Sequence, residues 1–328
     1  MEYTKLGSTG IKISRFVLGT MQFGWRVEEE GSFKVMDKAI ELGINCFDTA
    51  NVYTRWAENS YPGKSEAIIG KWLKDRETRE NLILATKLRG SMSDDINAKG
   101  LSRRHVHQAI TASLKRLQTD WIDLYQIHSF DEDTSIEETL HALNILVDNG
   151  KVNYLGASNI HPWMLVEAFW VSDKYGYARF ETVQPPYSIV RRMLVEHQMY
   201  HVIKKYGLGV IPYSPLAGGF LTDRYSKDSP LPDTPRSEGA QKRYFTEKRW
   251  KVHETVKEIA DSKNVKMTQI ALAWILTKDF ITAPIIGANS VEQLEENVGA
   301  LEIKLQDEEI KRLDKVSDWV EDYETTLR

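Results

Sequence analysis

Short apolar runs rich in β-branched residues alternate along this chain with longer stretches whose apolar positions recur every three or four residues. The short runs are typical of buried strands, and the longer stretches are typical of amphipathic helices. The runs predict eight strands, at residues 16–18, 45–48, 82–86, 122–127, 153–157, 182–184, 209–212 and 281–285. The longer stretches predict helices at residues 32–42, 65–73, 102–117, 136–148, 162–175, 195–206, 250–264 and 291–301.

Eight strands that are each followed by a helix predict a (β/α)8 barrel, or TIM barrel, which typically takes about 250 residues. This chain has 328 residues. We therefore expect an N-terminal hairpin that turns at residues 8–10, long βα loops such as 226–237, and extra C-terminal helices at 268–277 and 307–319. A doubly wound α/β sheet shares the alternation, but no G-x-G-x-x-G fingerprint follows a strand. The expected organisation is one domain over residues 1–328.

The composition and net charge of the chain disfavour several classes of binding partner. The chain has 43 Lys and Arg against 47 Asp and Glu, a net charge of −4, which disfavours a nucleic-acid or anionic-membrane partner. Its apolar runs fall short of the roughly 20 residues that cross a bilayer, and its N-terminus has no signal-peptide pattern. One cysteine, Cys46, cannot form an internal disulfide, so we expect a cytoplasmic protein. No metal-site spacing is present, and a homo-oligomer stays open.

Four polar residues stand at or just after predicted strand ends, where a barrel builds its active site. Asp48, Lys87 and His128 close the second, third and fourth strands, and Tyr53 follows Asp48 in the loop. Because the first three lie about one βα unit apart, they should reach the same rim of the barrel. Taken singly, each residue could be an ordinary strand-end, turn or loop residue. Together they suggest a proton relay, in which the lysine lowers the pKa of the phenol and the carboxylate keeps the lysine charged.

The motifs around these residues resemble the aldo-keto reductase superfamily over nearly the whole chain. The matching segments are residues 5–7, 18–20, 47–53, 86–87, 127–128, 156–159, 184–185, 213–216, 287 and 295–297. Segments 213–219 and 287–294 look most like the branch that contains bacterial reductases and the potassium-channel β-subunits. The resemblance implies a (β/α)8 barrel that binds a nicotinamide cofactor without a dinucleotide-binding fingerprint.

The resemblance also implies a reaction. Tyr53 would donate a proton to the substrate carbonyl oxygen as hydride arrives from the cofactor, Lys87 and Asp48 would tune its acidity, and His128 would orient the carbonyl. The expected function is an NADP(H)-dependent oxidoreductase that reduces an aldehyde or ketone to an alcohol. Two alternatives stay open. One is a nicotinamide-binding regulatory subunit that senses redox state with little turnover, and the other is a lyase or isomerase that forms a Schiff base on Lys87.

The same resemblance implies the cofactor contacts, and the position of two tryptophans in predicted rim loops suggests substrate contacts. Arg224 and Arg236 would bind a 2′-phosphate and select NADP(H), because guanidinium groups pair bidentately with phosphate. If these two arginines are instead ordinary charged loop residues, NAD(H) stays open as the cofactor. Trp25 and Trp56 either wall the substrate pocket or pack the rim loops. The other expected cofactor contacts are Thr20, Met21, Ser158, Asn159, Gln184, Tyr213, Ser214, Pro215, Leu216, Ala217, Gly218, Gly287, Asn289, Gln293, Glu296 and Asn297.

Overall fold

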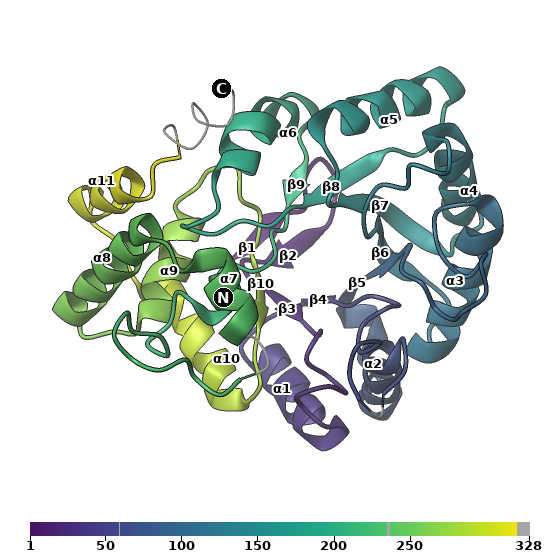
Figure 1. Cartoon of the computed structure of the whole chain (residues 1–328). Helices are drawn as coiled ribbons and strands as arrows, with labels where there is room; N and C mark the ends of the chain where they lie inside the picture. Colours follow the sequence, from purple (N-terminus) through teal and green to yellow (C-terminus); the bar gives the residue numbers. More distant parts are fainter. Residues whose placement is uncertain (59, 235–236, 320–328) are drawn as a thin grey trace.

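A sheet of eight parallel strands curls around the centre of the molecule (Figure 1). The computed structural model describes residues 1–58, 60–234 and 237–319. In the order of their hydrogen-bonded neighbours, the strands are β10 (Ile285–Gly287), β3 (Val17–Gly19), β4 (Cys46–Asp48), β5 (Ile83–Leu88), β6 (Ile122–Ile127), β7 (Val152–Ser158), β8 (Phe180–Gln184) and β9 (Gly209–Val210).

Backbone hydrogen bonds join the two edges of this sheet. The N–H of Thr282 donates to the carbonyl of Val210, and the N–H of Ile285 donates to the carbonyl of Pro212, both at 2.9 Å. The predicted (β/α)8 barrel is confirmed. The last strand was predicted at residues 281–285 but begins only at Ile285, because Pro284 has no N–H with which to extend a ladder.

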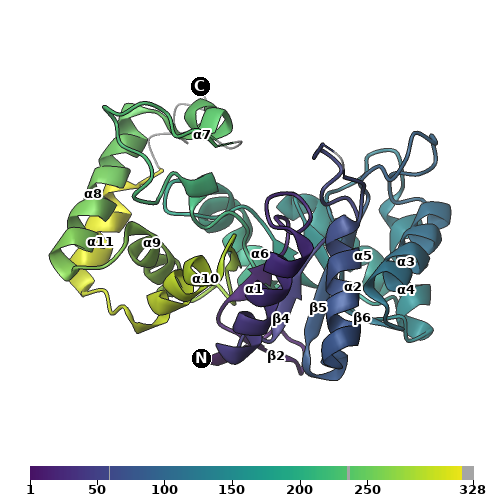
Figure 2. The same cartoon turned by 90° about the horizontal axis from the view of Figure 1, so that it is seen from below.

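Helices cover the outside of the barrel (Figures 1 and 2). They are α1 (Glu29–Glu41), α2 (Lys64–Arg76), α3 (Arg103–Leu117), α4 (Ile136–Asp148), α5 (Pro162–Tyr175), α6 (Tyr200–Tyr206), α7 (Ser237–Tyr244), α8 (Glu247–Lys263), α9 (Met267–Leu276), α10 (Val291–Val298) and α11 (Asp307–Val316). The helix predicted at 195–206 is divided, since a π-helical segment, Leu194–Met199, leads into α6. The short, polar α7 was not predicted. Within the described ranges, no helix combines the length and the apolar character that spanning a bilayer requires.

Capping side chains explain where several helices begin. The hydroxyls of Ser102, Ser135 and Ser290 each accept the backbone N–H three residues further on, at the starts of α3, α4 and α10. These bonds satisfy amide groups that a helix N-terminus leaves without partners. Gly207 ends α6 at a φ of 64°, a left-handed conformation that glycine adopts without strain. The helix ends are therefore encoded locally.

The N-terminal hairpin lies under the barrel. It consists of β1 (Tyr3–Lys5) and β2 (Lys12–Ser14). Leu6 and Ile13 of the hairpin are buried in one apolar cluster with barrel residues, among them Val17 and Ile211. The hairpin thereby seals the amino end of the barrel, so the functional groups gather at the opposite end, where parallel strands finish.

Candidate active site

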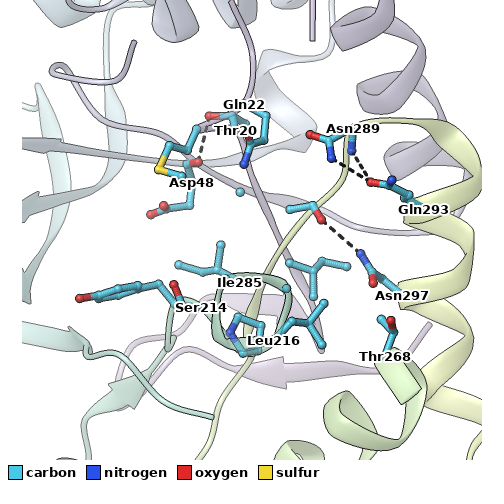
Figure 3. Close-up of a pocket in the computed structure, with 18 of the residues that line it drawn as sticks. Thr20, Gln22, Asp48, Ser214, Leu216, Thr268, Ile285, Asn289, Gln293 and Asn297 are labelled. Carbon is cyan, nitrogen blue, oxygen red and sulfur yellow. Dashed lines mark hydrogen bonds between the residues drawn. The ribbon is translucent and has the colours of Figure 1, made fainter. Parts of the chain in front are cut away.

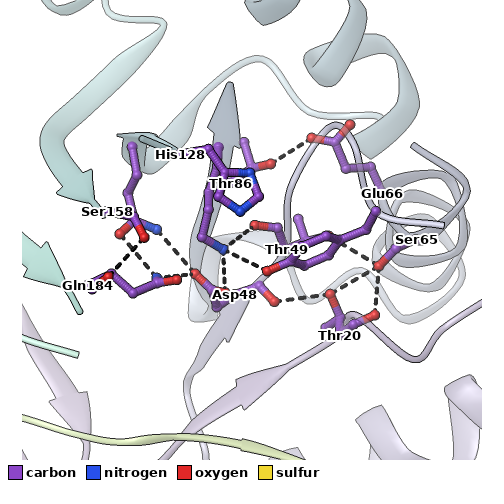
Figure 4. A network of polar contacts seen from close by, with 12 residues as sticks. Thr20, Asp48, Thr49, Ser65, Glu66, Thr86, His128, Ser158 and Gln184 are labelled. Atoms are coloured by element: carbon purple, nitrogen blue, oxygen red, sulfur yellow. Dashed lines mark hydrogen bonds and ion pairs between the residues drawn. The ribbon is translucent and has the colours of Figure 1, made fainter. Parts of the chain in front are cut away.

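The side chain of Lys87 is fully buried at the carboxyl end of β5, within a polar cluster (Figure 4). Its Nζ donates to Asp48 Oδ2 at 2.6 Å, to the carbonyl oxygen of Thr49 at 2.8 Å and to Tyr53 Oη at 3.1 Å. A buried ammonium is costly unless it is paired and hydrogen-bonded, and here all three of its donors have partners. The structure thus brings three of the four predicted catalytic residues into direct contact.

Two glutamine amides hold the other oxygen of Asp48. Its Oδ1 accepts from Gln126 Nε2 at 3.1 Å and from Gln184 Nε2 at 2.8 Å. Gln126 pairs with Lys87 in the register of β5 and β6, and sequence reasoning missed it. A signal was available, because Gln126 stands two residues before His128 and alternate strand residues share a face. Both oxygens of the carboxylate are therefore fixed in place.

Ser65, the second residue of α2, fixes the loops that follow β3 and β4. Its hydroxyl donates to the carbonyl oxygen of Thr20 at 2.9 Å and lies 3.1 Å from Thr49 Oγ1. Thr20 Oγ1 in turn donates to the carbonyl oxygen of Asp48 at 3.0 Å. Because the Thr49 carbonyl receives a hydrogen bond from Lys87, this helix N-terminus supports the polar cluster from outside (Figure 4). Ser65 was not among the predicted site residues.

Burial and charge act in opposite directions on these groups. Burial raises the pKa of Tyr53, and the nearby Lys87 charge only partly opposes that rise. The expected lowering of the Tyr53 pKa is not found, because desolvation of the phenolate outweighs the ammonium. Burial lowers the pKa of Lys87, but Asp48 and Tyr53 together raise it by more than burial lowers it. The resulting pKa lies above the usual value of lysine. Lys87 is therefore an ammonium at neutral pH and lacks the free amine that a Schiff base requires.

His128 stands beside the phenol. Its ring centroid lies 5.9 Å from that of Tyr53, with the two planes at 73°. Burial, followed by the charges of Lys87 and Arg89, lowers the pKa of His128 to about 3. The imidazole is thus neutral at physiological pH, with one nitrogen that donates and one that accepts.

A cleft of about 530 Å³ opens over the carboxyl ends of the strands (Figure 3). Asp48, Tyr53 and His128 line it, and so do all the expected cofactor contacts in the described part of the chain except Ala217. The Ala217 side chain packs in the hydrophobic core instead. Arg236 lies outside the described residues. Gln22, Arg26, Lys266 and Thr268 also line the cleft and were not predicted.

The two tryptophans predicted at the substrate pocket lie beside Tyr53 rather than in this cleft. The ring of Trp56 is 6.2 Å from the ring of Tyr53, and the ring of Trp25 is 5.7 Å from that of Trp56. Trp56 is exposed, with 49% of its surface accessible. The two rings form an aromatic surface next to the phenol of Tyr53. Their role as substrate contacts stays a prediction.

The cleft has features that suit a dinucleotide. Among the residues that the structure describes, the buried side-chain oxygens of Gln22 and Asn289 have no hydrogen-bond partner, and the N–H or O–H groups of a bound ligand would satisfy them. Gly218, with a φ of 69°, lets the chain pass close to a ligand, because a side chain at this position would project into open space. At the other end of the cleft, the side chains of Ser158, Asn159 and Tyr213 are joined by hydrogen bonds at 3.0 and 2.8 Å.

Two arginine side chains line the same cleft. Arg26 and Arg224 both line it, and the pKa of Arg26 is lowered by burial and, to a smaller extent, by the charge of Arg224. An anion bound near both guanidinium groups would offset the repulsion between them. A phosphate is such an anion, and Ser290 at the start of α10 caps a helix N-terminus that faces the same cleft.

A parallel barrel with a buried Asp48–Lys87–Tyr53 cluster beside a cleft at the carboxyl ends of its strands is the arrangement that the family resemblance implies. A model of the aldo/keto reductase family matches residues 15–318, and the chain belongs to this family. It is 39% identical to the uncharacterised oxidoreductase YrpG of Bacillus subtilis, over 96% of both chains. It is 33% identical to a putative aryl-alcohol dehydrogenase of Schizosaccharomyces pombe, over 95% of both chains, and 33% identical to versiconal hemiacetal acetate reductase of Aspergillus parasiticus, over 96% of both.

Proposed function

We propose that the protein is an NADP(H)-dependent reductase that converts an aldehyde or ketone to an alcohol. One observation carries the proposal: the Lys87 ammonium contacts both the Tyr53 hydroxyl, at 3.1 Å, and the Asp48 carboxylate, at 2.6 Å, at the base of the cleft. The names of two relatives, an alcohol dehydrogenase and a reductase, denote the same type of reaction in opposite directions.

Tyr53 is the proposed general acid. Burial keeps its phenol protonated at neutral pH, so it can give a proton to the carbonyl oxygen of the substrate. Lys87 then stabilises the phenolate through a hydrogen bond that already exists. The neutral His128 donates an N–H to the same carbonyl oxygen and stabilises the charge that develops there. A bound nicotinamide cofactor supplies the hydride.

Residues at one end of the cleft would bind the nicotinamide of that cofactor, and residues at the other end would bind its phosphate groups. Ser158, Asn159 and the carbonyl oxygen of the Gln184 side chain are proposed to hold the nicotinamide amide. Arg26 and Arg224 are proposed to bind phosphate groups, with Arg224 giving the preference for NADP(H) over NAD(H). The neighbouring positive charges described above support this assignment.

The first test is NADPH oxidation with 4-nitrobenzaldehyde and methylglyoxal. Tyr53→Phe should lower kcat by about 100-fold or more, because the proton donor is lost while the ring is kept. Tyr175→Phe, at the far end of α5, is the matched control and should keep wild-type turnover. Full activity in Tyr53→Phe would contradict the assigned acid. Tight NADPH binding without turnover by the wild-type protein would instead favour the redox-sensing subunit.

The cofactor assignment has a separate test. We expect Arg224→Ala to weaken NADPH binding by about ten-fold or more and NADH binding much less, because a charge-assisted pair with the 2′-phosphate is lost. Fluorescence titration of both cofactors measures this ratio, with the exposed Arg104→Ala as the control for net charge. A ratio that does not change would remove Arg224 from the 2′-phosphate site.

A further inference from the structure

Arg89 follows β5 directly, two residues beyond Lys87. The β5–β6 register pairs Leu88 with Ile127, and the N–H of His128 donates to the Leu88 carbonyl at 2.9 Å. One further step along that register sets Arg89 beside His128. Arg89 therefore stands at the same rim as Lys87 and His128, although it is not among the residues that line the cleft.

The backbone at Arg89 is held in a conformation that side-chain-bearing residues rarely adopt. Its φ is 111°, whereas arginine ordinarily keeps φ negative. The carbonyl of Arg89 accepts the N–H of Gly100 at 2.9 Å, which holds the strand end in place. Residues held in such strained conformations cluster at active sites and ligand-binding positions.

The guanidinium of Arg89 has no partner among the described residues. Its Nε is buried without a hydrogen bond, and no carboxylate in the described part of the chain pairs with it. Other partly buried arginines are satisfied: Arg15 donates to three carbonyl oxygens, and Arg116 pairs with Glu66. Asp131, an acid near Gly100, is already engaged by the N–H of Leu101 and the hydroxyl of Thr134. A half-buried guanidinium without an acceptor is costly, and an anionic ligand would relieve that cost.

We propose, resting on the reductase function above, that Arg89 binds the carboxylate of the substrate and that carbonyl compounds bearing a carboxylate are the preferred substrate class. The planar guanidinium accepts a carboxylate bidentately, and its position beside His128 aligns the reacting carbonyl with Tyr53. The aromatic rings of Trp56 and Trp25, next to Tyr53, would pack against the apolar body of such a substrate.

The experiment compares 2-, 3- and 4-carboxybenzaldehyde with their methyl esters, using NADPH oxidation to obtain kcat/KM. Wild-type protein should prefer at least one acid over its ester. Arg89→Met should lower that acid-to-ester ratio by about ten-fold or more, mainly through KM, and Arg89→Lys should lower it less. Arg104→Met, which removes an exposed charge, should keep the ratio. The ester measured on the same variant reports whether the variant is folded.

Two results would overturn the proposal: wild-type protein that prefers every ester, or an Arg89→Met variant that loses acid and ester turnover equally. Calorimetric titration with 4-(hydroxymethyl)benzoate, the expected product, gives a readout that does not need turnover. Weaker binding to Arg89→Met than to wild type supports the carboxylate site, and equal binding contradicts it. A wild-type protein that binds this carboxylate but reduces no aldehyde refutes the reductase function alone.

Discussion

Single side chains set the charge state of the reaction centre. Lys87 is kept charged by Asp48, Tyr53 is kept protonated by burial, and His128 is kept neutral by burial and by the positive charges of Lys87 and Arg89. Each state is the one that the proposed carbonyl reduction would use, namely a proton donor, a neutral hydrogen-bond donor and a cation that stabilises the phenolate. The environment of each residue, rather than its residue type, produces this combination.

The pKa of His128 leads to a prediction about pH. Because burial lowers it to about 3, the imidazole stays neutral at every pH well above that value. We expect kcat/KM for aldehyde reduction to show no inflection near pH ~6.5, the ordinary pKa of histidine. Steady-state profiles from about pH 5.5 to pH 8, with His128→Asn as a non-titrating comparison, measure this. An inflection near pH ~6.5 that disappears in His128→Asn would contradict the neutral state.

At the scale of elements, the outer helices support the strand ends. Ser65 of α2 fixes the loops that carry Thr20 and Thr49, so the position of α2 affects the partners of Lys87. Gly70, one turn further along α2, lies against the end of α3: a Cβ there would come within 2.1 Å of the Arg116 carbonyl oxygen. α2 and α3 can approach this closely because Gly70 has no side chain.

Gly70→Ala should therefore destabilise the protein, although alanine is otherwise the better helix former. The clash is with backbone, which cannot turn aside, so we expect the free energy of unfolding to fall by about 1–3 kcal/mol. Urea unfolding followed by circular dichroism measures the change. Gly10→Ala is the control, because a Cβ at Gly10 meets no atom within 4 Å. Equal stability of Gly70→Ala and wild type would show that the helices can separate without cost.

The sequence predicts repeated elements better than single contacts. The bounds of α4 and α5 coincide with their predicted ranges, because long periodic stretches and serine or proline starts are local signals. The π-helical segment, the short α7 and the late start of β10 depend on tertiary packing or on a single proline. The gathering of Asp48, Lys87 and His128 follows from strand spacing. The roles of Gln126, Ser65 and Arg26 could not be predicted, since they depend on which side chains meet across neighbouring elements.

At the scale of the whole molecule, the start of the barrel meets the segment that joins β9 to β10 at the seam of the sheet. Arg15, between the hairpin and β3, donates to the carbonyl oxygens of Leu276, Ile281 and Thr282, at 2.6 to 3.2 Å. Thr282 also donates to Val210, at the point where the sheet closes. One side chain from the start of the sequence thus orders the segment that joins β9 to β10.

Removing that guanidinium should loosen the seam. Arg15→Met leaves three carbonyl groups without their charged donor, and we expect the free energy of unfolding to fall by about 3 kcal/mol. Thermal unfolding and hydrogen exchange at residues 276–285 measure the loss, with the exposed Arg104→Met as the control. If Arg15→Met unfolds at the wild-type temperature and residues 276–285 exchange no faster, the seam is held by other contacts.

The sealed amino end of the barrel would restrict how Tyr53 regains its proton in the proposed reaction. The side chains of Leu6, Ile13, Val17 and Ile211 on that side of Lys87 are apolar and cannot relay a proton. After each turnover of the proposed reaction, the tyrosinate would therefore be reprotonated from the mouth that admits the substrate. The alcohol would leave and the proton would return through that same mouth, so a product that leaves slowly would also delay the reprotonation of Tyr53.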